Sequence, residues 1–166
     1  MLLQAAAHSI WDLGFRIADF DVWSDHGPLT TNKIMSQENI ELINNIYTLF
    51  NDRRYDEILP NFAGDMTWVA ADSSPLADES PYHGPANIRE RVFGRIEAGF
   101  ESLTVRTDEI FGAEGRVVVL GYYDSLIKGR ETSTQIQLAH IWTVRDGKAV
   151  KFQQYVDTYA IAESFK

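Results

Sequence analysis

The second half of the chain constrains the fold most, because four strand-like segments follow one another with only short turns between them. These segments are rich in β-branched and aromatic residues, and they cover residues 102–111, 117–127, 132–145 and 149–156. The intervening turns all contain glycine, at residues 112–115, 128–130 and 145–148. This spacing is typical of hairpins, so we predict a run of antiparallel strands.

Helical periodicity replaces this pattern in the first half of the chain. Ile43, Ile46 and Phe50 recur at a helical spacing, which predicts an amphipathic helix over residues 36–51. The remaining predicted elements are a helix over residues 56–62, a strand over 66–70, a helix that begins at Pro85 and a brief helix over 159–165. Helices first and hairpins afterwards predict an α+β fold with an antiparallel sheet.

The chain has 166 residues, enough for one domain with its own core and too few for two ordinary domains. The character of the sequence changes near residues 27–33, where Gly27-Pro28 follows a helical pattern over residues 2–20. We therefore divide the chain into an N-terminal extension, residues 1–34, and a domain, residues 35–166. The extension is predicted to be helical. It is either a native appendage that packs on the domain or a non-native addition.

Composition limits the partners that the protein can have. Acidic residues outnumber basic residues by 24 to 15, giving a formal net charge of −9, so we expect no nucleic-acid partner. The absence of cysteine excludes disulfides and fits a cytoplasmic location. No apolar run reaches the roughly 20 residues that a membrane span needs. The four histidines lack paired spacing and no glycine-rich phosphate loop occurs, so we expect neither a metal ion nor a cofactor.

Strand parity makes His140 the first candidate site residue. Side chains alternate across a strand, and the even positions from 136 to 144 are more apolar than the odd ones, so the even positions should face the core. Apolar surroundings disfavour imidazolium, so the ring should be neutral. A neutral ring donates one hydrogen bond and accepts another, which suits an electrophile or a proton shuttle. The alternative is a core histidine satisfied by a backbone carbonyl or a tyrosine.

Two carboxylates and one tyrosine complete the candidate catalytic set. Asp157 stands where the last strand meets the final helix, and it either caps that helix or points into the pocket as a base. Asp72 shares strand parity with Trp68, and it is either a base at the pocket mouth or a turn residue. Tyr47 either aims its hydroxyl inward or keeps its tip at the surface.

Aromatic side chains are expected to form most of the pocket wall. Tyr82 and His83 come just before the helix that begins at Pro85, and they either cover the pocket or are ordinary loop residues. The full predicted set of pocket-lining residues is Trp68, Tyr82, His83, Phe93, Phe100, Trp142 and Phe152.

Three segments resemble the SnoaL-like and ketosteroid-isomerase-related group of the nuclear transport factor 2-like superfamily. They are residues 43–62, the Tyr82-His83-Gly84 sequence before a helix, and residues 139–158. The resemblance extends from about residue 35 to residue 165. It implies a cone-shaped fold, in which a curved antiparallel sheet is wrapped by three helices around one apolar pocket. It also implies a homodimer that forms through the sheet.

Transferred residue by residue, the resemblance retains only part of an isomerase site. The helix tyrosine of the isomerases corresponds to Ile46, and their carboxylate base corresponds to Ala70, two residues before Asp72. Their protonated acid corresponds to His140 when strand parity decides the alignment. SnoaL-like polyketide cyclases place a catalytic aspartate just before the final helix, where this chain has Asp157.

The principal hypothesis is a small cofactor-independent enzyme of the isomerase, cyclase or lyase type. Asp157 or Asp72 would remove a proton from a hydrophobic carbonyl compound, while His140, with Tyr47, would stabilise the enolate. The first alternative is a non-catalytic module that binds a hydrophobic molecule in the same pocket.

The second alternative is an epoxide hydrolase, which needs an inward-facing Asp-Arg-Asp arrangement. Only Arg106 and Asp108, which share parity on one strand, hint at it. Under each hypothesis we expect a small hydrophobic molecule as the partner, no nucleic acid, no membrane, and a homodimer through the sheet.

Overall fold

The structure is a computed structural model, and it describes residues 28–166. Its helices are α1 (Pro28–Asn51), α2 (Tyr55–Ile58), η1 (Leu59–Asn61), α3 (Pro85–Ile88), η2 (Arg89–Phe93), α4 (Gly94–Gly99) and α5 (Thr158–Ser164). Its strands are β1 (Phe62–Val69), β2 (Tyr82–His83), β3 (Phe100–Ala113), β4 (Arg116–Ile127), β5 (Thr134–Arg145) and β6 (Lys148–Val156). The helix predicted over residues 2–20 lies outside the described residues.

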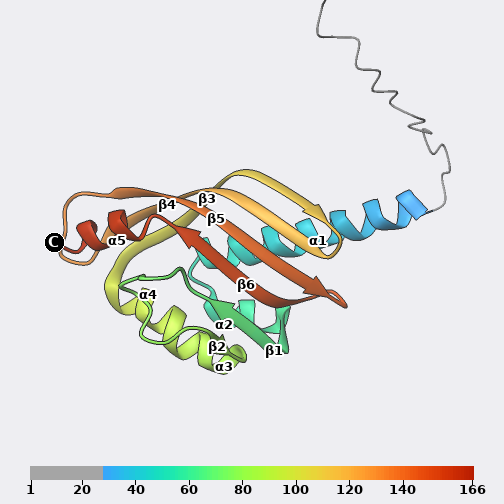
Figure 1. Cartoon of the computed structure of the whole chain (residues 1–166). Coiled ribbons are helices and arrows are strands. Elements are labelled where there is room, and N and C mark those ends of the chain that lie inside the picture. The colour runs from blue at the N-terminus through green and yellow to red at the C-terminus, as the bar shows by residue number, and fades with distance from the viewer. Residues whose placement is uncertain (1–27) are drawn as a thin grey trace, which may run out of the picture.

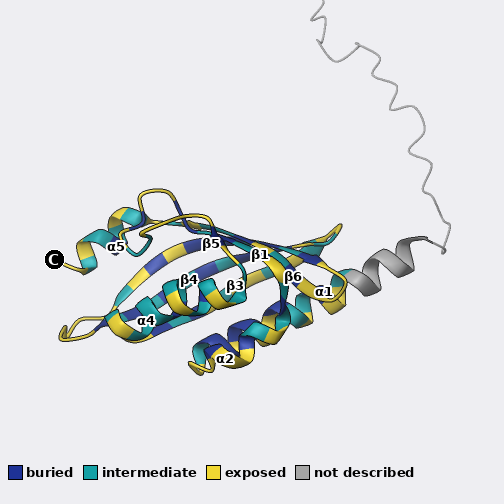
Figure 2. Cartoon of the chain, turned by 90° about the horizontal axis from the view of Figure 1, so that it is seen from below, coloured by how far each residue is buried: buried dark blue, intermediate teal, exposed yellow. Residues whose placement is uncertain are grey.

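The six strands form one sheet in the order β2-β1-β6-β5-β4-β3. The long strands β3 to β6 are successive antiparallel neighbours, as the short glycine-containing turns predict. The sheet curves, and α1, α2 and α4 lie on one of its faces (Figures 1 and 2). The predicted α+β class, a curved sheet wrapped by helices, is confirmed.

The first strand departs from the predicted all-antiparallel pairing. β1 runs parallel to β6, with Trp68 opposite Phe152. A parallel neighbour needs a long crossover connection, and the helices and hairpins between the two strands supply it. The two-residue strand β2, which pairs with β1, was not predicted.

Alternation of side chains separates the core face of the sheet from its outer face. Odd positions from 117 to 127 on β4 and even positions from 136 to 144 on β5 are buried, while the positions between them are partly or fully exposed. Figure 2 shows this alternation along the strands. The buried rows pack against Ile43, Ile46 and Phe50 of α1, the residues whose periodicity predicts that helix.

Helix α1 begins earlier than predicted, at Pro28 rather than Ser36. Proline suits a first helical turn, because it fixes φ and its missing N–H has no partner to lose there. Ser36, the first residue of the predicted helix, lies inside α1 and donates a hydrogen bond to the Gly112 carbonyl. The division proposed at residue 34 therefore falls inside α1. Among the described residues, no helix is both long and apolar enough to span a membrane.

Candidate functional site

Two adjoining cavities lie between the sheet and the helices. The outer cavity has a volume of about 60 Å³ and the inner cavity about 10 Å³. A water molecule needs roughly 10–15 Å³, so the outer cavity has room for a small ligand, whereas the inner one is almost filled by side chains. Phe50, Trp68 and Tyr123 line both cavities. The predicted single pocket is thus divided in two.

His140 lines the inner cavity and is 1% exposed. The Tyr47 hydroxyl lies 2.8 Å from its Nδ1, and the Tyr123 hydroxyl lies 3.1 Å from its Nε2. The imidazole, predicted to face the core, therefore has a tyrosine at each ring nitrogen. Phe152 packs edge-on against it, with ring centroids 4.8 Å apart.

The hydrogen-bonded network continues beyond both tyrosines. On one side, the Trp142 indole donates to the Tyr47 hydroxyl at 2.8 Å. On the other side, the Gln154 amide donates to the Tyr123 hydroxyl at 2.9 Å. The Gln154 carbonyl oxygen in turn accepts from the backbone N–H of Ala71 at 3.2 Å. We call these five side chains, Trp142, Tyr47, His140, Tyr123 and Gln154, the relay.

Burial keeps the ionisable members of the relay neutral. Desolvation lowers the pKa of His140 to about 3, so the ring is uncharged at neutral pH. Desolvation raises the pKa of Tyr47 well above its usual value, against the lowering effect of the Trp142 hydrogen bond. Desolvation likewise raises the pKa of Tyr123, against the Gln154 hydrogen bond. The relay can therefore donate and accept hydrogen bonds at neutral pH without carrying a charge.

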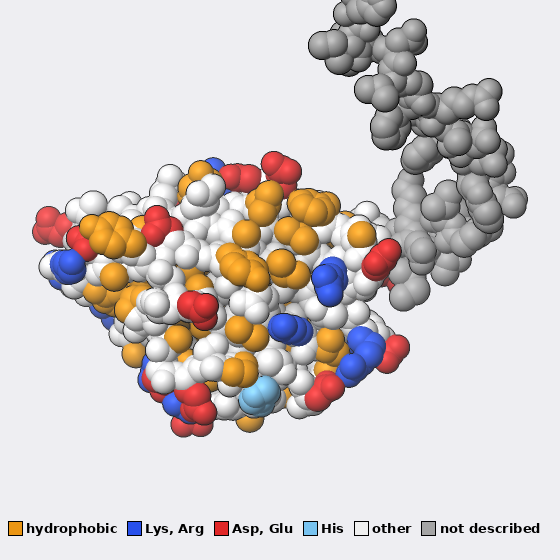
Figure 3. Space-filling model, in the orientation of Figure 1, with side chains coloured by type: hydrophobic (Ala, Val, Ile, Leu, Met, Phe, Trp, Pro, Cys, Tyr) orange, Lys and Arg blue, Asp and Glu red, His pale blue; other side chains and the backbone are white. Residues whose placement is uncertain are grey.

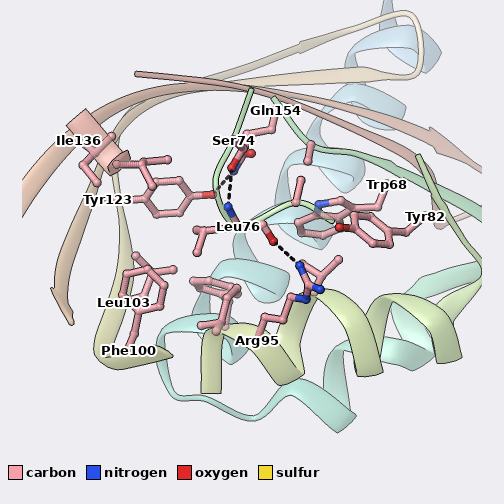
Figure 4. A pocket seen from close by; sticks show the side chains of 16 residues that line it. Trp68, Ser74, Leu76, Tyr82, Arg95, Phe100, Leu103, Tyr123, Ile136 and Gln154 are labelled. Atoms are coloured by element: carbon pink, nitrogen blue, oxygen red, sulfur yellow. Dashed lines mark hydrogen bonds between the residues drawn. The ribbon is translucent and has the colours of Figure 1, made fainter. Parts of the chain in front are cut away.

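The outer cavity has apolar walls and a few polar groups at its ends. Tyr123 points from the sheet toward Gln154, and Arg95 enters from α4 (Figure 4). The Arg95 guanidinium donates to the Leu76 carbonyl at 3.1 Å and pairs with Asp78. Within the described part of the chain, Arg95 is the one charged side chain that lines this cavity.

Residues 71–81, which we call the lid segment, cover the outer cavity. Ser74, Leu76 and Ala77 of this segment line it. Asp78 holds the segment in place, because its carboxylate accepts from Arg91 at 2.5 Å and from the Tyr82 hydroxyl at 2.9 Å.

Two predicted catalytic carboxylates do not reach either cavity. Asp157 is exposed and caps α5, where its carboxylate accepts from the N–H of Ala160 at 2.9 Å. The strand ends before its side chain can turn inward, so its role as a pocket base is wrong and the capping alternative holds. Asp72 is exposed in the turn that follows β1, so it is a turn residue.

The predicted lining residues divide between the two cavities. Trp68, Tyr82 and Phe100 line the outer cavity, while Trp68, Phe93, Trp142 and Phe152 line the inner one. His83 is an exposed residue of β2 whose ring lies 3.3 Å from the Thr67 hydroxyl, and it lines neither cavity. The strand turns it outward because its neighbour Tyr82 occupies the inner face.

Sequence reasoning missed Tyr123, Gln154 and Arg95. Parity on β4 could have found Tyr123, since the charged Asp124 marks the even positions as outward-facing. Gln154 and Arg95 carry no comparable signal, because their placement depends on how β6 and α4 meet the lid segment.

The residues invoked for epoxide hydrolysis lie on the wrong face of the sheet. Arg106 and Asp108 have side chains 48% and 43% exposed and contact each other outside the cavities. Within residues 28–166, no group of three histidine or acidic side chains converges as metal ligands do.

Comparison with known proteins identifies the family. The model of the SnoaL-like domain family matches residues 43–152, well over half of the chain. A search of curated proteins found no significant match. Among solved structures, TerC, co-crystallised with polyporic acid, is 29% identical with a TM-score of 0.67, over 76% of this chain and 96% of TerC.

Other solved structures share the fold at lower identity. A nuclear transport factor 2-like protein of unknown function from Burkholderia pseudomallei is 23% identical with a TM-score of 0.69, over 76% of this chain and 95% of that one. A protein with a ketosteroid isomerase-like fold from Catenulispora acidiphila is 19% identical with a TM-score of 0.65, over 75% and 91%. The chain belongs to the SnoaL-like domain family and has the nuclear transport factor 2-like fold.

Proposed function

We propose that this domain binds a small hydrophobic molecule in the outer cavity, with Tyr123 and Gln154 as its polar contacts. The observation that carries this proposal is the cavity itself, which is lined mostly by apolar side chains with a few polar ones among them. Burial of apolar surface in such a site provides affinity, and a few placed polar groups provide orientation. The co-crystallisation of the similar protein TerC with polyporic acid supports the proposal.

The chemistry of the described interior favours binding over the carboxylate mechanism predicted from the sequence. A general base must lie within hydrogen-bonding reach of the proton that it removes. Neither cavity is lined by an aspartate or a glutamate. His140 is a weak base, because burial lowers its pKa to about 3.

A second candidate function is an isomerase, cyclase or lyase activity in which Tyr123 replaces the aspartates as the reacting group. The specific observation in its favour is that Tyr123 joins His140 to the outer cavity. A tyrosine that is hydrogen-bonded to a histidine can polarise the carbonyl group of a substrate as negative charge develops on the carbonyl oxygen.

A ligand screen tests the proposal. Steroids, polyketides, terpenoids, lipids and polyporic acid would be tested for a rise in Tm, and each compound that binds would be followed for turnover. Ala77→Phe should fill the outer cavity and abolish binding, because Ala77 lines it. Ala98→Phe, the same change at an exposed position of α4, is the matched control and should leave binding intact. Equal binding by both variants would place the ligand elsewhere.

A further inference from the structure

We propose that His140 carries its hydrogen on Nε2, and that the Tyr123 hydroxyl hydrogen is therefore free to bond an oxygen atom of the bound molecule. This inference rests on the proposed function and names the class of molecule that the outer cavity takes. The molecule is an apolar compound whose carbonyl oxygen lies at Tyr123.

The orientation of the Gln154 amide is the first step. The backbone N–H of Ala71 can only donate, so the atom of Gln154 that faces it must be the carbonyl oxygen. The other end of the amide, the NH₂ group, therefore faces Tyr123 and donates to its hydroxyl oxygen. The backbone thus fixes an assignment that side-chain geometry alone leaves open.

The second step is a count of hydrogens along the relay. The Trp142 indole is also only a donor, so the Tyr47 oxygen accepts from it. A neutral imidazole donates from one nitrogen and accepts at the other. One of the two tyrosines must therefore donate to His140 while the other accepts from it, and the accepting tyrosine keeps a hydroxyl hydrogen with no partner in the relay.

The surroundings decide which tyrosine keeps the unused hydrogen. Tyr47 lines only the inner cavity, whose volume of about 10 Å³ leaves no room for a ligand. An unpaired buried donor there would be costly. Tyr123 also lines the outer cavity, where an acceptor can be supplied.

The two distances agree with this assignment. The bond from Tyr47 to Nδ1 is 2.8 Å, a usual length when a hydroxyl donates, and the contact between Nε2 and Tyr123 is 3.1 Å, within the range for an N–H donor. In this assignment Tyr47 donates to Nδ1, and Nε2–H donates to Tyr123.

The chemical consequence concerns the strength of Tyr123 as a donor. Its oxygen accepts two hydrogen bonds, one from His140 and one from Gln154. Hydrogen bonds in a chain polarise one another, which strengthens the donation from its own hydroxyl. In an apolar cavity this hydroxyl should select an oxygen acceptor such as a ketone or quinone carbonyl.

The tautomer can be measured without any ligand. Nitrogen NMR of histidine-labelled protein distinguishes an Nε2–H ring from an Nδ1–H ring. Replacing His8, His26 and His83 by glutamine leaves His140 as the single histidine of the chain. The Nε2–H pattern is the expected result. An Nδ1–H pattern would overturn the inference and leave the proposed function standing.

Acetophenone and α-methylstyrene test the hydrogen bond, because they share the same heavy-atom skeleton and only acetophenone has a carbonyl. We expect the protein to bind acetophenone more tightly by about threefold to tenfold, as one net hydrogen bond allows. The carbonyl stretch of bound acetophenone should shift to lower frequency. Tyr123→Phe should remove both effects, whereas Tyr122→Phe, on the outer face of the same strand, should retain them.

The outcomes distinguish a failure of this inference from a failure of the proposed function. If both compounds bind and Tyr123→Phe keeps the preference for the ketone, the inference fails while binding in the cavity stands. If neither compound binds in this cavity, the result contradicts the proposed function, whichever nitrogen of His140 carries the hydrogen.

Discussion

His140 links the stability of the protein to pH. Burial holds its pKa in the folded state at about 3, below the value of roughly 6.5 expected in the unfolded chain. Between these values the unfolded state binds more protons than the folded state. The contribution of the neutral ring is thus complete above pH ~6.5 and falls by about 1.4 kcal/mol per pH unit as acid is added.

His140→Gln should flatten this dependence while retaining a polar side chain. Denaturant unfolding at several pH values from 7 down to 4 would show a shallower loss of stability in the variant than in the unsubstituted protein. His83→Gln, at an exposed position of β2, is the control and should leave the slope unchanged. Identical slopes in all three proteins would show that His140 is charged in the folded state or is not buried.

Individual residues show how far sequence reasoning reaches. The even-numbered positions of β5 carry no charged residue, so the alternation of side chains along the strand is enough to predict that His140 points inward. Asp157 lies just beyond a strand, where parity no longer holds, and only the start of α5 decides its direction. Tyr47 could be given no direction from sequence, because its inward aim depends on hydrogen bonds with two distant residues of β5.

At the scale of single elements, the bend in β3 depends on one glycine of β4. The register of the two strands shifts between Thr107 and Glu109, opposite Gly121. A Cβ atom at Gly121 would lie 2.0 Å from the Arg106 carbonyl oxygen. The backbones approach this closely because the bulge left at Asp108 curves the strand.

Gly121→Ala should therefore destabilise the protein by about 2 kcal/mol or more, since the obstacle is backbone that cannot move aside cheaply. Gly64→Ala is the matched control, because a Cβ atom there meets nothing within 4 Å. Denaturant unfolding of both variants makes the comparison. A Gly121→Ala protein as stable as the Gly64→Ala protein would contradict the close approach of the strands.

The lid segment is a second element, and its Asp78 forms ion pairs with Arg91 and Arg95. Hydrogen bonds from Arg91 and Tyr82 lower the pKa of Asp78 to about 2, so the carboxylate stays charged at neutral pH. Asp78→Asn removes that charge and should loosen residues 71–81. Hydrogen exchange of these amides should become faster, while the protection of β4 and β5 stays unchanged.

Asp72→Asn provides the control for the lid, because Asp72 is an exposed residue of the same segment. Raised salt should mimic Asp78→Asn in the unsubstituted protein, since the ion pairs of Asp78 are partly exposed and are screened. Unchanged exchange rates in Asp78→Asn would mean that other contacts, such as those of Leu76 with Arg95 and of Ala71 with Gln154, hold the lid segment.

At the scale of the whole molecule, the fold class followed from the order of elements, whereas the division of the interior did not. The strands after residue 100 and the helix over residues 36–51 had clear periodicity, and each is present. Whether side chains fill the space between the strands and the helix depends on how those side chains pack, and the periodicity of the sequence does not predict that packing. The large ring of Tyr123 lines both cavities, and Phe50 and Trp68 do so from α1 and β1.

The outer face of the sheet bears on the oligomeric state. Figure 3 shows hydrophobic side chains gathered over β5 and β6, with a few charged side chains among them and others at the edges. Tyr155 is 56% exposed on this face, and Val118 and Ile141 lie opposite each other on neighbouring strands. We propose that a second copy of the chain covers this face in a symmetric dimer, in which the same patch serves both subunits.

The mass in solution tests this dimer. Light scattering after gel filtration should give about twice the chain mass of 18.9 kDa. Ile141→Glu would place a charge on the outer face of β5, where desolvating it would be costly, and should give monomers. Ala98→Glu adds the same charge on α4, away from the sheet, and should leave the dimer intact. Because Ile141 points away from both cavities, a monomeric Ile141→Glu variant should still bind its ligand. A monomeric mass for the unsubstituted protein at high concentration would contradict the proposal.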